Sequence, residues 1–168
     1  MCKDALEEVE GGDEIVPFMR AGTATSPADT RLFWMGDQNL TYTKFDGMQS
    51  AMIGLLNANM SGFTMGHSDI GGYTSSTNPV FPIIRDANLN SRWIEMSAFS
   101  DMIMRSHPTN LPDDNLQIYN DVETVQFMAK FVRIHANLLN DYKQQLMQGA
   151  YENGTPIIRS LMLNFPDD

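Results

Sequence analysis

Short apolar runs recur along this 168-residue chain, and each ends in polar residues that are followed by a loop or a helical pattern. Four such runs stand at 14–19, 32–35, 62–65 and 102–104. Runs of this length suit strands that are buried on both faces. A repeated order of strand, loop and helix is typical of parallel strands joined by crossover helices. The sequence therefore predicts an α/β fold with about four parallel strands and helices on the outer side.

Helical spacing of apolar residues appears at 45–59, 88–99 and 121–147. The last stretch has one stripe at alternating steps of three and four, formed by Val125, Met128, Val132, His135, Leu139, Tyr142 and Leu146. We expect this whole stripe to be buried, with His135 as a core residue rather than a ligand. Residues 1–12 suit a helix end closed by two glycines, and the tail at 156–165 suits another strand.

Composition narrows the class of partner. A net charge of −10 would repel a phosphate backbone, which disfavours nucleic-acid binding. No apolar run has the length that spans a bilayer, so we expect no membrane segment. The single cysteine, Cys2, excludes an internal disulfide and a cysteine metal cluster. The polar, acidic start has no signal-peptide pattern, and the compartment stays open with the cytoplasm slightly favoured.

Polar side chains gather directly after the apolar runs. Arg20, Asp37, Asp69 and His107 each follow a different run. In a (β/α) barrel the active site lies at the carboxyl ends of the strands, so these residues would converge there. A doubly wound sheet gives the same pattern. Each residue also has an ordinary explanation, because a turn aspartate, a surface ion pair and a structural histidine are common features.

Several segments, in order along the chain, resemble glycoside hydrolase family 31. They are 18–22 (Phe-Met-Arg-Ala-Gly), 33–38 (Phe-Trp-Met-Gly-Asp-Gln), 61–73 with its Asp-Ile-Gly-Gly-Tyr end, 92–107 with Arg-Ser-His at its end, and the tail 154–168. The resemblance implies a partial TIM (β/α)8 barrel, with its C-terminal half at 1–155. It implies that 156–168 leave this barrel toward a C-terminal β domain. Gly-Gly-Tyr and Arg-x-His are most similar to the sulfoquinovosidase branch, which releases sulfoquinovose from its α-glycosides.

The resemblance also implies roles for single residues. Asp37 matches the family's general acid/base, which protonates the departing glycosidic oxygen and then activates water. Trp34 would supply an apolar wall beside this acid. Arg20 and His107 match residues that hydrogen-bond sugar hydroxyls near the scissile bond.

Three further residues complete the substrate site that the resemblance implies. Asp69 is similar to a sugar-pocket carboxylate, and Gln38 follows the acid in the same motif. Tyr73 matches the position where the sulfoquinovosidase branch helps to hold the sulfonate, since a phenol can donate to an anionic oxygen. A pocket-lining aromatic is an equally good interpretation of Tyr73. His67 and Asp69 form a His-x-Asp pair, but no third ligand stands at a metal-binding spacing, so we expect neither metal nor cofactor.

A retaining glycosidase needs a second carboxylate, the nucleophile. In the family it lies on an earlier strand, and only Asp4 and Asp13 precede Arg20 here, without the motif that surrounds it. We therefore expect a catalytic fragment that is inactive alone and needs the missing N-terminal half of the barrel to act on an α-glucoside or α-sulfoquinovoside. The alternative is a non-catalytic carbohydrate-binding remnant. A phosphate binder built on Gly71 and Gly72 is disfavoured, because no Gly-x-Gly-x-x-Gly or Walker pattern is present.

Overall fold

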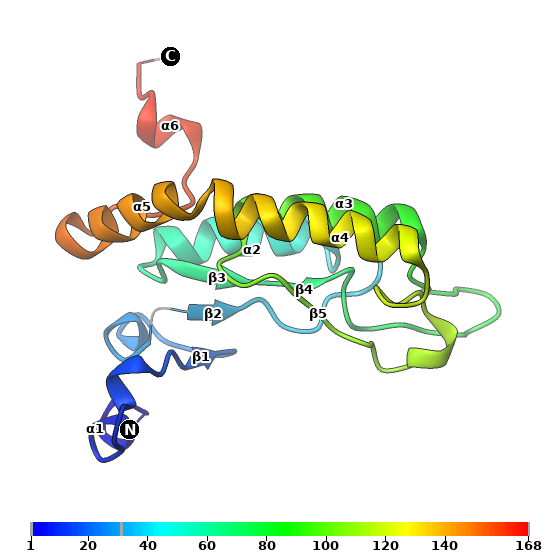
Figure 1. The fold of residues 1–168 in the computed structure, drawn as a ribbon, viewed down its shortest axis with the longest axis horizontal. Coiled ribbons are helices and arrows are strands. Elements are labelled where there is room, and N and C mark those ends of the chain that lie inside the picture. The colour runs from blue at the N-terminus through cyan, green and yellow to red at the C-terminus, as the bar shows by residue number, and fades with distance from the viewer. Residues whose placement is uncertain (1, 31, 168) are drawn as a thin grey trace.

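A computed structural model describes residues 2–30 and 32–167, and its strands are all parallel (Figure 1). Strands β1 (Phe18–Met19), β2 (Leu32–Trp34) and β3 (Met65–His67) form one sheet in that order. Strand β4 (Asp69–Ile70) continues from β3 after one residue and pairs with β5 (Arg105–Ser106). Neighbouring strands therefore follow the order of the chain, as successive strands of a barrel do, and the expected parallel α/β architecture is confirmed.

Helices join these strands and gather on one side of them. They are α1 (Cys2–Glu7), η1 (Gly12–Glu14), η2 (Ser26–Ala28), α2 (Met48–Met60), α3 (Ala87–Ser100), η3 (Pro112–Asp114), α4 (Val122–Arg133), the π-helix η4 (Ile134–Leu138), α5 (Asn140–Asn153) and α6 (Leu161–Asn164). Figure 1 shows α2 to α5 on the same side of the strands, whereas α1 lies near the start of β1. None of the described helices has the length and apolar character needed to cross a bilayer.

The two faces of the sheet carry different side chains. Gly66 of β3 faces α2, and a Cβ atom placed there would lie 2.2 Å from the Leu55 Cδ2 atom. Its partner in register, Phe33, packs on Phe63 with ring centroids 4.7 Å apart. Side chains alternate along a strand, so Trp34 and His67, which pair with each other, face away from α2. This second face is the one that the interior of a closed barrel would contain.

The apolar core lies between the strands and α3. It consists of Leu40, Ala51, Ile70, Leu89, Trp93, Ile94, Ala98 and Phe131. Trp93 is fully buried, and its indole N–H donates to the Ser68 hydroxyl oxygen at 3.0 Å. Helix α3 begins at the N-cap Asp86, whose carboxylate accepts from the Leu89 N–H. The linker residue between β3 and β4 is therefore tied directly to the core helix.

The predicted helix at 121–147 is interrupted, and its stripe is only partly buried. The Leu139 N–H donates to the Ile134 carbonyl at 3.0 Å, which is the i to i+5 bond of the π-helix between α4 and α5. The extra residue in this turn rotates α5 relative to α4. The apolar residues before and after the π-helix therefore do not lie on one face. His135 is buried as expected, whereas Val125, Val132 and Tyr142 are exposed.

Four expected strand positions differ from the structure. The first strand starts at Phe18 instead of 14, and Glu14 belongs to η1. The tail at 156–165 contains α6 rather than a strand, and the Ile158 N–H binds the side-chain carbonyl of Asn59 at 3.1 Å. The third strand starts at Met65, because Gly62 (φ 93°) makes the turn that ends α2. The fourth strand starts at Arg105 instead of 102.

Candidate active site

The loops after β1 and β2 bring Arg20 and Asp37 together. The Arg20 Nη2 atom lies 3.3 Å from the Asp37 Oδ2 atom, and the carboxylate side chain is 31% exposed. The Arg20 guanidinium also stacks over the Trp34 ring, 4.9 Å from its centroid. Gly36 has φ 89°, a left-handed conformation that favours glycine and turns the chain back toward Arg20. Three residues of the predicted site are therefore in direct contact.

The loop after β4 carries Tyr73 to His107. Their ring centroids are 4.6 Å apart in an edge-to-face arrangement. The backbone carbonyl of Gln38 accepts hydrogen bonds from the N–H groups of Tyr73 (2.8 Å) and Thr74 (2.9 Å). The Thr74 hydroxyl donates to the Asp37 carbonyl at 2.9 Å. The loop of the predicted acid is thus joined by backbone hydrogen bonds to the loop of Tyr73.

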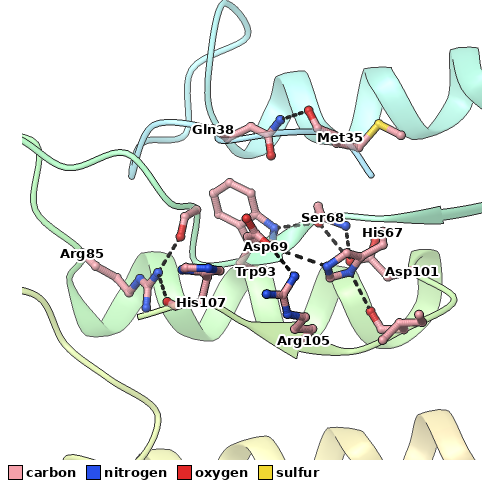
Figure 2. A network of polar contacts seen from close by, with 12 residues as sticks. Met35, Gln38, His67, Ser68, Asp69, Arg85, Trp93, Asp101, Arg105 and His107 are labelled. Atoms are coloured by element: carbon pink, nitrogen blue, oxygen red, sulfur yellow. Dashed lines mark hydrogen bonds and ion pairs between the residues drawn. The ribbon is translucent and has the colours of Figure 1, made fainter. Parts of the chain in front are cut away.

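The Gln38 side chain is almost fully buried. Its amide nitrogen donates to the Met35 carbonyl, as Figure 2 shows, and its Oε1 atom has no hydrogen-bond partner among the described residues. The NH₂ group of the Gln38 amide therefore stabilises the turn after β2.

Asp69 lies inside β4 rather than in the loop after it, and it is completely buried. Its Oδ1 atom is 3.5 Å from the His67 Nε2 atom and 3.8 Å from the Arg105 Nη1 atom (Figure 2). The His67 Nδ1 atom lies 3.0 Å from the Ile103 carbonyl oxygen. In the described part of the chain, no group of three or more His, Cys, Asp and Glu side chains is placed to hold a metal ion.

A second buried carboxylate, Asp101, lies next to Ser68, the residue between β3 and β4. Its Oδ2 atom accepts from both the backbone N–H (3.1 Å) and the hydroxyl (2.9 Å) of Ser68. Burial raises the pKa of Asp101 to about 6, although the bonds from Ser68 and the field of His67 oppose the shift. This residue joins the end of α3 to the linker between β3 and β4.

Arg85 is a structural member of the site that the sequence motifs do not identify. It is 2% exposed, and its guanidinium donates to the carbonyl oxygens of Gly71 (3.2 Å), Gly72, His107 (2.9 Å) and Leu116 (3.3 Å). Burial lowers the pKa of Arg85 to about 10, and the charge of Asp69 opposes this shift. Arg85 stands just before α3 outside any recognisable motif, so its sequence context suggests only a surface residue.

Buried polar atoms without a hydrogen-bond partner among the described residues collect in this region. They are Trp34 Nε1, Gln38 Oε1, His67 Nε2, both carboxylate oxygens of Asp69, and His107 Nδ1, and three more lie on α3, the two amide atoms of Asn90 and the Ser97 hydroxyl. Unpaired buried polar groups are rare in folded proteins, so their number here sets this region apart from the apolar core. Cavities at other places, such as one of about 300 Å³ beside α5 and the tail, do not include these atoms. The residues of the predicted site therefore lie among buried polar groups and not beside that cavity.

Comparison with known proteins identifies the family of this chain. The profile of the glycosyl hydrolases family 31 TIM-barrel domain matches residues 1–143. A sulfoquinovosidase from Escherichia coli (strain K12) is 38% identical over 165 residues, which cover 98% of this chain and 24% of the relative. An alpha-glucosidase from Schizosaccharomyces pombe is 28% identical over 135 residues, covering 80% of this chain and 12% of that protein.

A solved structure gives the same result. The family 31 sulfoquinovosidase from E. rectale, in complex with the aza-sugar inhibitor IFGSQ, superimposes with a TM-score of 0.88 at 37% identity. The match covers 99% of this chain and 25% of that protein, so the chain spans about a quarter of the sulfoquinovosidases that it resembles. The chain belongs to glycoside hydrolase family 31, as a part of its TIM-barrel domain.

Proposed function

We propose that this chain is the acid/base-bearing segment of a retaining α-glycoside hydrolase, with Asp37 as the proton donor. The observation that carries the proposal is the placement of Asp37 between Arg20 and the Tyr73 loop, at the carboxyl ends of parallel strands. A carboxyl group there is partly exposed and can reach the oxygen of a bound glycoside. Arg20 lies close enough to orient the carboxylate and still offers N–H donors to a sugar.

The remaining residues form the wall that binds the sugar ring. His107 is half-buried and its ring packs edge-to-face on Tyr73, so the two side chains together can present an imidazole and a phenol to a sugar. Asp69 is completely buried and acts on the sugar through Arg105, whose partly exposed guanidinium lies 3.8 Å away, and Gln38 supports the turn that carries Asp37. Within the α-glycoside class, the Tyr73 phenol favours a substrate with an anionic group, such as an α-sulfoquinovoside, over a plain α-glucoside.

The nucleophile must come from the rest of the barrel. Asp4 and Asp13 lie in α1 and η1, before β1 begins, at the end of the strands opposite to Asp37. We place residues 1–155 in the C-terminal half of the barrel and regard 156–168 as its exit toward a β domain. The same observation favours a second candidate, a carbohydrate-binding remnant that retains this wall without turnover.

The test is hydrolysis by the complete enzyme, in which these residues are joined to the rest of the barrel. Aryl α-sulfoquinovoside and aryl α-glucoside should both be assayed, and proton NMR should identify the anomer that is released first. Release of the α-anomer would support the retaining mechanism, because two inversions at one carbon restore its configuration. Sugar binding without turnover would support the remnant, and the β-anomer would exclude the retaining mechanism.

A further inference from the structure

We propose that Arg85 is a positioning residue that fixes the Tyr73 edge of the site relative to the His107 edge. The effect on catalysis rests on the proposed function, whereas the contacts of Arg85 with the two loops do not depend on it. Tyr73 follows β4 and His107 follows β5, so the two rings are held by loops that are separate in sequence. The guanidinium of Arg85 touches both loops beside these rings, and farther along the loops Asn110 also bonds to Tyr73 and Ser75.

The hydrogen bonds of Arg85 divide between the two loops. The Nε atom donates to the Gly71 carbonyl, and the Nη2 atom donates to both the Gly72 and the His107 carbonyls. The Gly72 carbonyl immediately precedes Tyr73. One nitrogen atom therefore joins the backbone beside Tyr73 to the backbone of His107, directly behind the contact between their rings.

The two glycines of the Asp-Ile-Gly-Gly-Tyr segment allow this approach. Gly71 (φ 80°) would bring a Cβ atom within 2.7 Å of the Arg85 Nε atom. Gly72 (φ 78°) would bring one within 3.0 Å of the Asn39 carbonyl oxygen. Both residues need the left-handed conformation, and neither has room for a side chain. The glycine pair thus shapes the backbone to receive a guanidinium.

Lysine cannot replace this arrangement. Arginine presents donors in a rigid, planar fork, whereas lysine has one ammonium nitrogen on a flexible stem. A single ammonium cannot reach the Gly71, Gly72, His107 and Leu116 carbonyls together. The proposal therefore predicts that Arg85→Lys loosens the two loops although it keeps the charge.

The experiment compares Arg85→Ala, Arg85→Lys and the matched control Arg92→Ala in the complete enzyme. Arg92 lies in α3, the helix that follows Arg85, and it pairs with Glu95 of the same helix at 2.6 Å. We expect kcat/KM of both Arg85 variants to fall by about 10²-fold, as small misplacements of binding groups can cause. The ratio of rates on good and poor leaving groups should stay unchanged, because Asp37 keeps its own contacts. Arg92→Ala should behave as the wild type.

Guanidinium chloride, at concentrations far below those that unfold proteins, separates positioning from general stability. It should restore part of the activity of Arg85→Ala by filling the space between the four carbonyls. A variant that is merely destabilised would instead lose activity, since guanidinium is a denaturant. Wild-type kcat/KM in either Arg85 variant, or an Arg85→Ala activity that guanidinium only lowers, would overturn the proposal.

Hydrogen exchange measured by mass spectrometry tests the clamp without substrate. Amides at 71–75 and 107–111 should exchange faster in Arg85→Lys than in the wild type, and amides of α2 should not change. Unchanged exchange in both loops would overturn the proposal even if Arg85→Ala does not fold. A wild-type enzyme that hydrolyses no glycoside would refute the proposed function instead, and the exchange result would still decide the role of Arg85.

Discussion

Asp37 is held at two points, at its carboxylate by Arg20 and at its backbone carbonyl by Thr74. Arg20 offers it a cation at 3.3 Å, and that same cation is stacked on the apolar face of Trp34. The backbone carbonyl of Asp37 accepts a hydrogen bond from the Thr74 hydroxyl, which fixes the main chain. The ion pair with Arg20 orients the carboxylate. A side chain that is tethered at its backbone and exposed at its carboxylate suits repeated proton transfer.

Asp37→Asn in the complete enzyme should remove the proton donor and leave the nucleophile in place. Substrates with good leaving groups need little protonation and should still form the glycosyl-enzyme, whereas poor leaving groups should slow by about 10²–10⁴-fold. Azide, which needs no general base, should partly rescue turnover of the intermediate. Stopped-flow and steady-state rates across a series of aryl α-glycosides measure this. Unaltered rates on poor leaving groups would remove the acid/base assignment.

Tyr73→Phe tests the sulfosugar preference separately. Loss of a hydrogen bond to a charged group costs about 1.5–3 kcal/mol, so KM for an α-sulfoquinovoside should rise by roughly 10–100-fold. KM for the matching α-glucoside, which lacks the sulfonate, should change little. Equal effects on both substrates in steady-state assays would contradict the sulfonate role and leave the family membership intact.

Sequence motifs identify the side chains that face the site better than those that hold them. Arg20, Trp34 and Asp37 were expected together and are in contact. Arg85 and the Asp69–Arg105 pair were not expected, because their partners are backbone carbonyls or a strand neighbour that only folding brings near. Pattern reasoning finds residues with a chemical signature, whereas a buried guanidinium beside carbonyls has none.

At the scale of elements, the contact between α2 and β3 depends on one small residue. Leu55 fills the space above Gly66, and this contact presses the helix onto the sheet. The opposite face of the same strand carries His67, which approaches Asp69. A displacement of α2 would therefore be transmitted through β3 to the polar site.

Gly66→Ala should lower the free energy of unfolding by about 1–3 kcal/mol, because overpacking moves backbone as well as side chains. Gly149→Ala is the matched control: it lies in α5 with no atom within 4 Å of an added Cβ. It should raise stability by about 0.5–1 kcal/mol, through the higher helix propensity of alanine. Thermal unfolding of both variants measures the difference, and a Gly66→Ala protein as stable as the wild type would contradict the packing account.

Asp101 predicts a pH dependence of stability. Its pKa is raised to about 6 in the folded protein, so the folded state binds its proton more tightly than the unfolded state, where the pKa is near 3.8. Stability should therefore fall as the pH rises from about 4 to 6, by at most about 1.4 kcal/mol per pH unit from this group. Asp101→Asn keeps an oxygen for Ser68 and should flatten that slope. Identical slopes in urea titrations of the two proteins would show that Asp101 is not responsible.

The order and direction of the elements could be predicted from hydrophobic runs, but their ends and breaks could not. The π-helix at Ile134–Leu138 depends on packing, since His135 lies within hydrogen-bond distance of the Ala98 and Met102 carbonyls. Steps of three and four cannot reveal where a helix gains one residue. The apolar tail suggested a strand, yet none of the described strands pairs with it, and it forms the short α6 instead.

At the scale of the whole molecule, the strands form two open sheets that adjoin at β3 and β4, with α2 to α5 on one side of them (Figure 1). Among the described strands, β1 pairs only with β2, and β5 pairs only with β4. The outer edges of β1 and β5 are therefore unpaired among the described strands. In a closed barrel the other strands pair with such edges and cover the inner face. This openness explains why the residues of the site line a wall rather than a pocket.

The isolated 168 residues should hydrolyse aryl α-glycosides no faster than the background reaction. General acid catalysis alone contributes about 10²–10⁴-fold, and in the proposed mechanism the nucleophile of the covalent step comes from the rest of the barrel. Release of the aryl group by the isolated chain is the measurement, with its Asp37→Asn variant as the control. Activity that this substitution abolishes would show that the chain is catalytically complete.

The hydrogen bond between Asn59 and Ile158 of the tail conflicts with N-linked glycosylation at Asn59. Asn59, Met60 and Ser61 form an acceptor triplet for N-linked glycosylation. Asn59 is 1% exposed, its amide nitrogen donates to the Leu55 carbonyl, and its oxygen accepts from Ile158. A glycan on that nitrogen is incompatible with this packing. In a secretory compartment, modification at Asn59 would compete with folding, whereas the exposed Asn153 in a second triplet could carry a glycan on the finished surface.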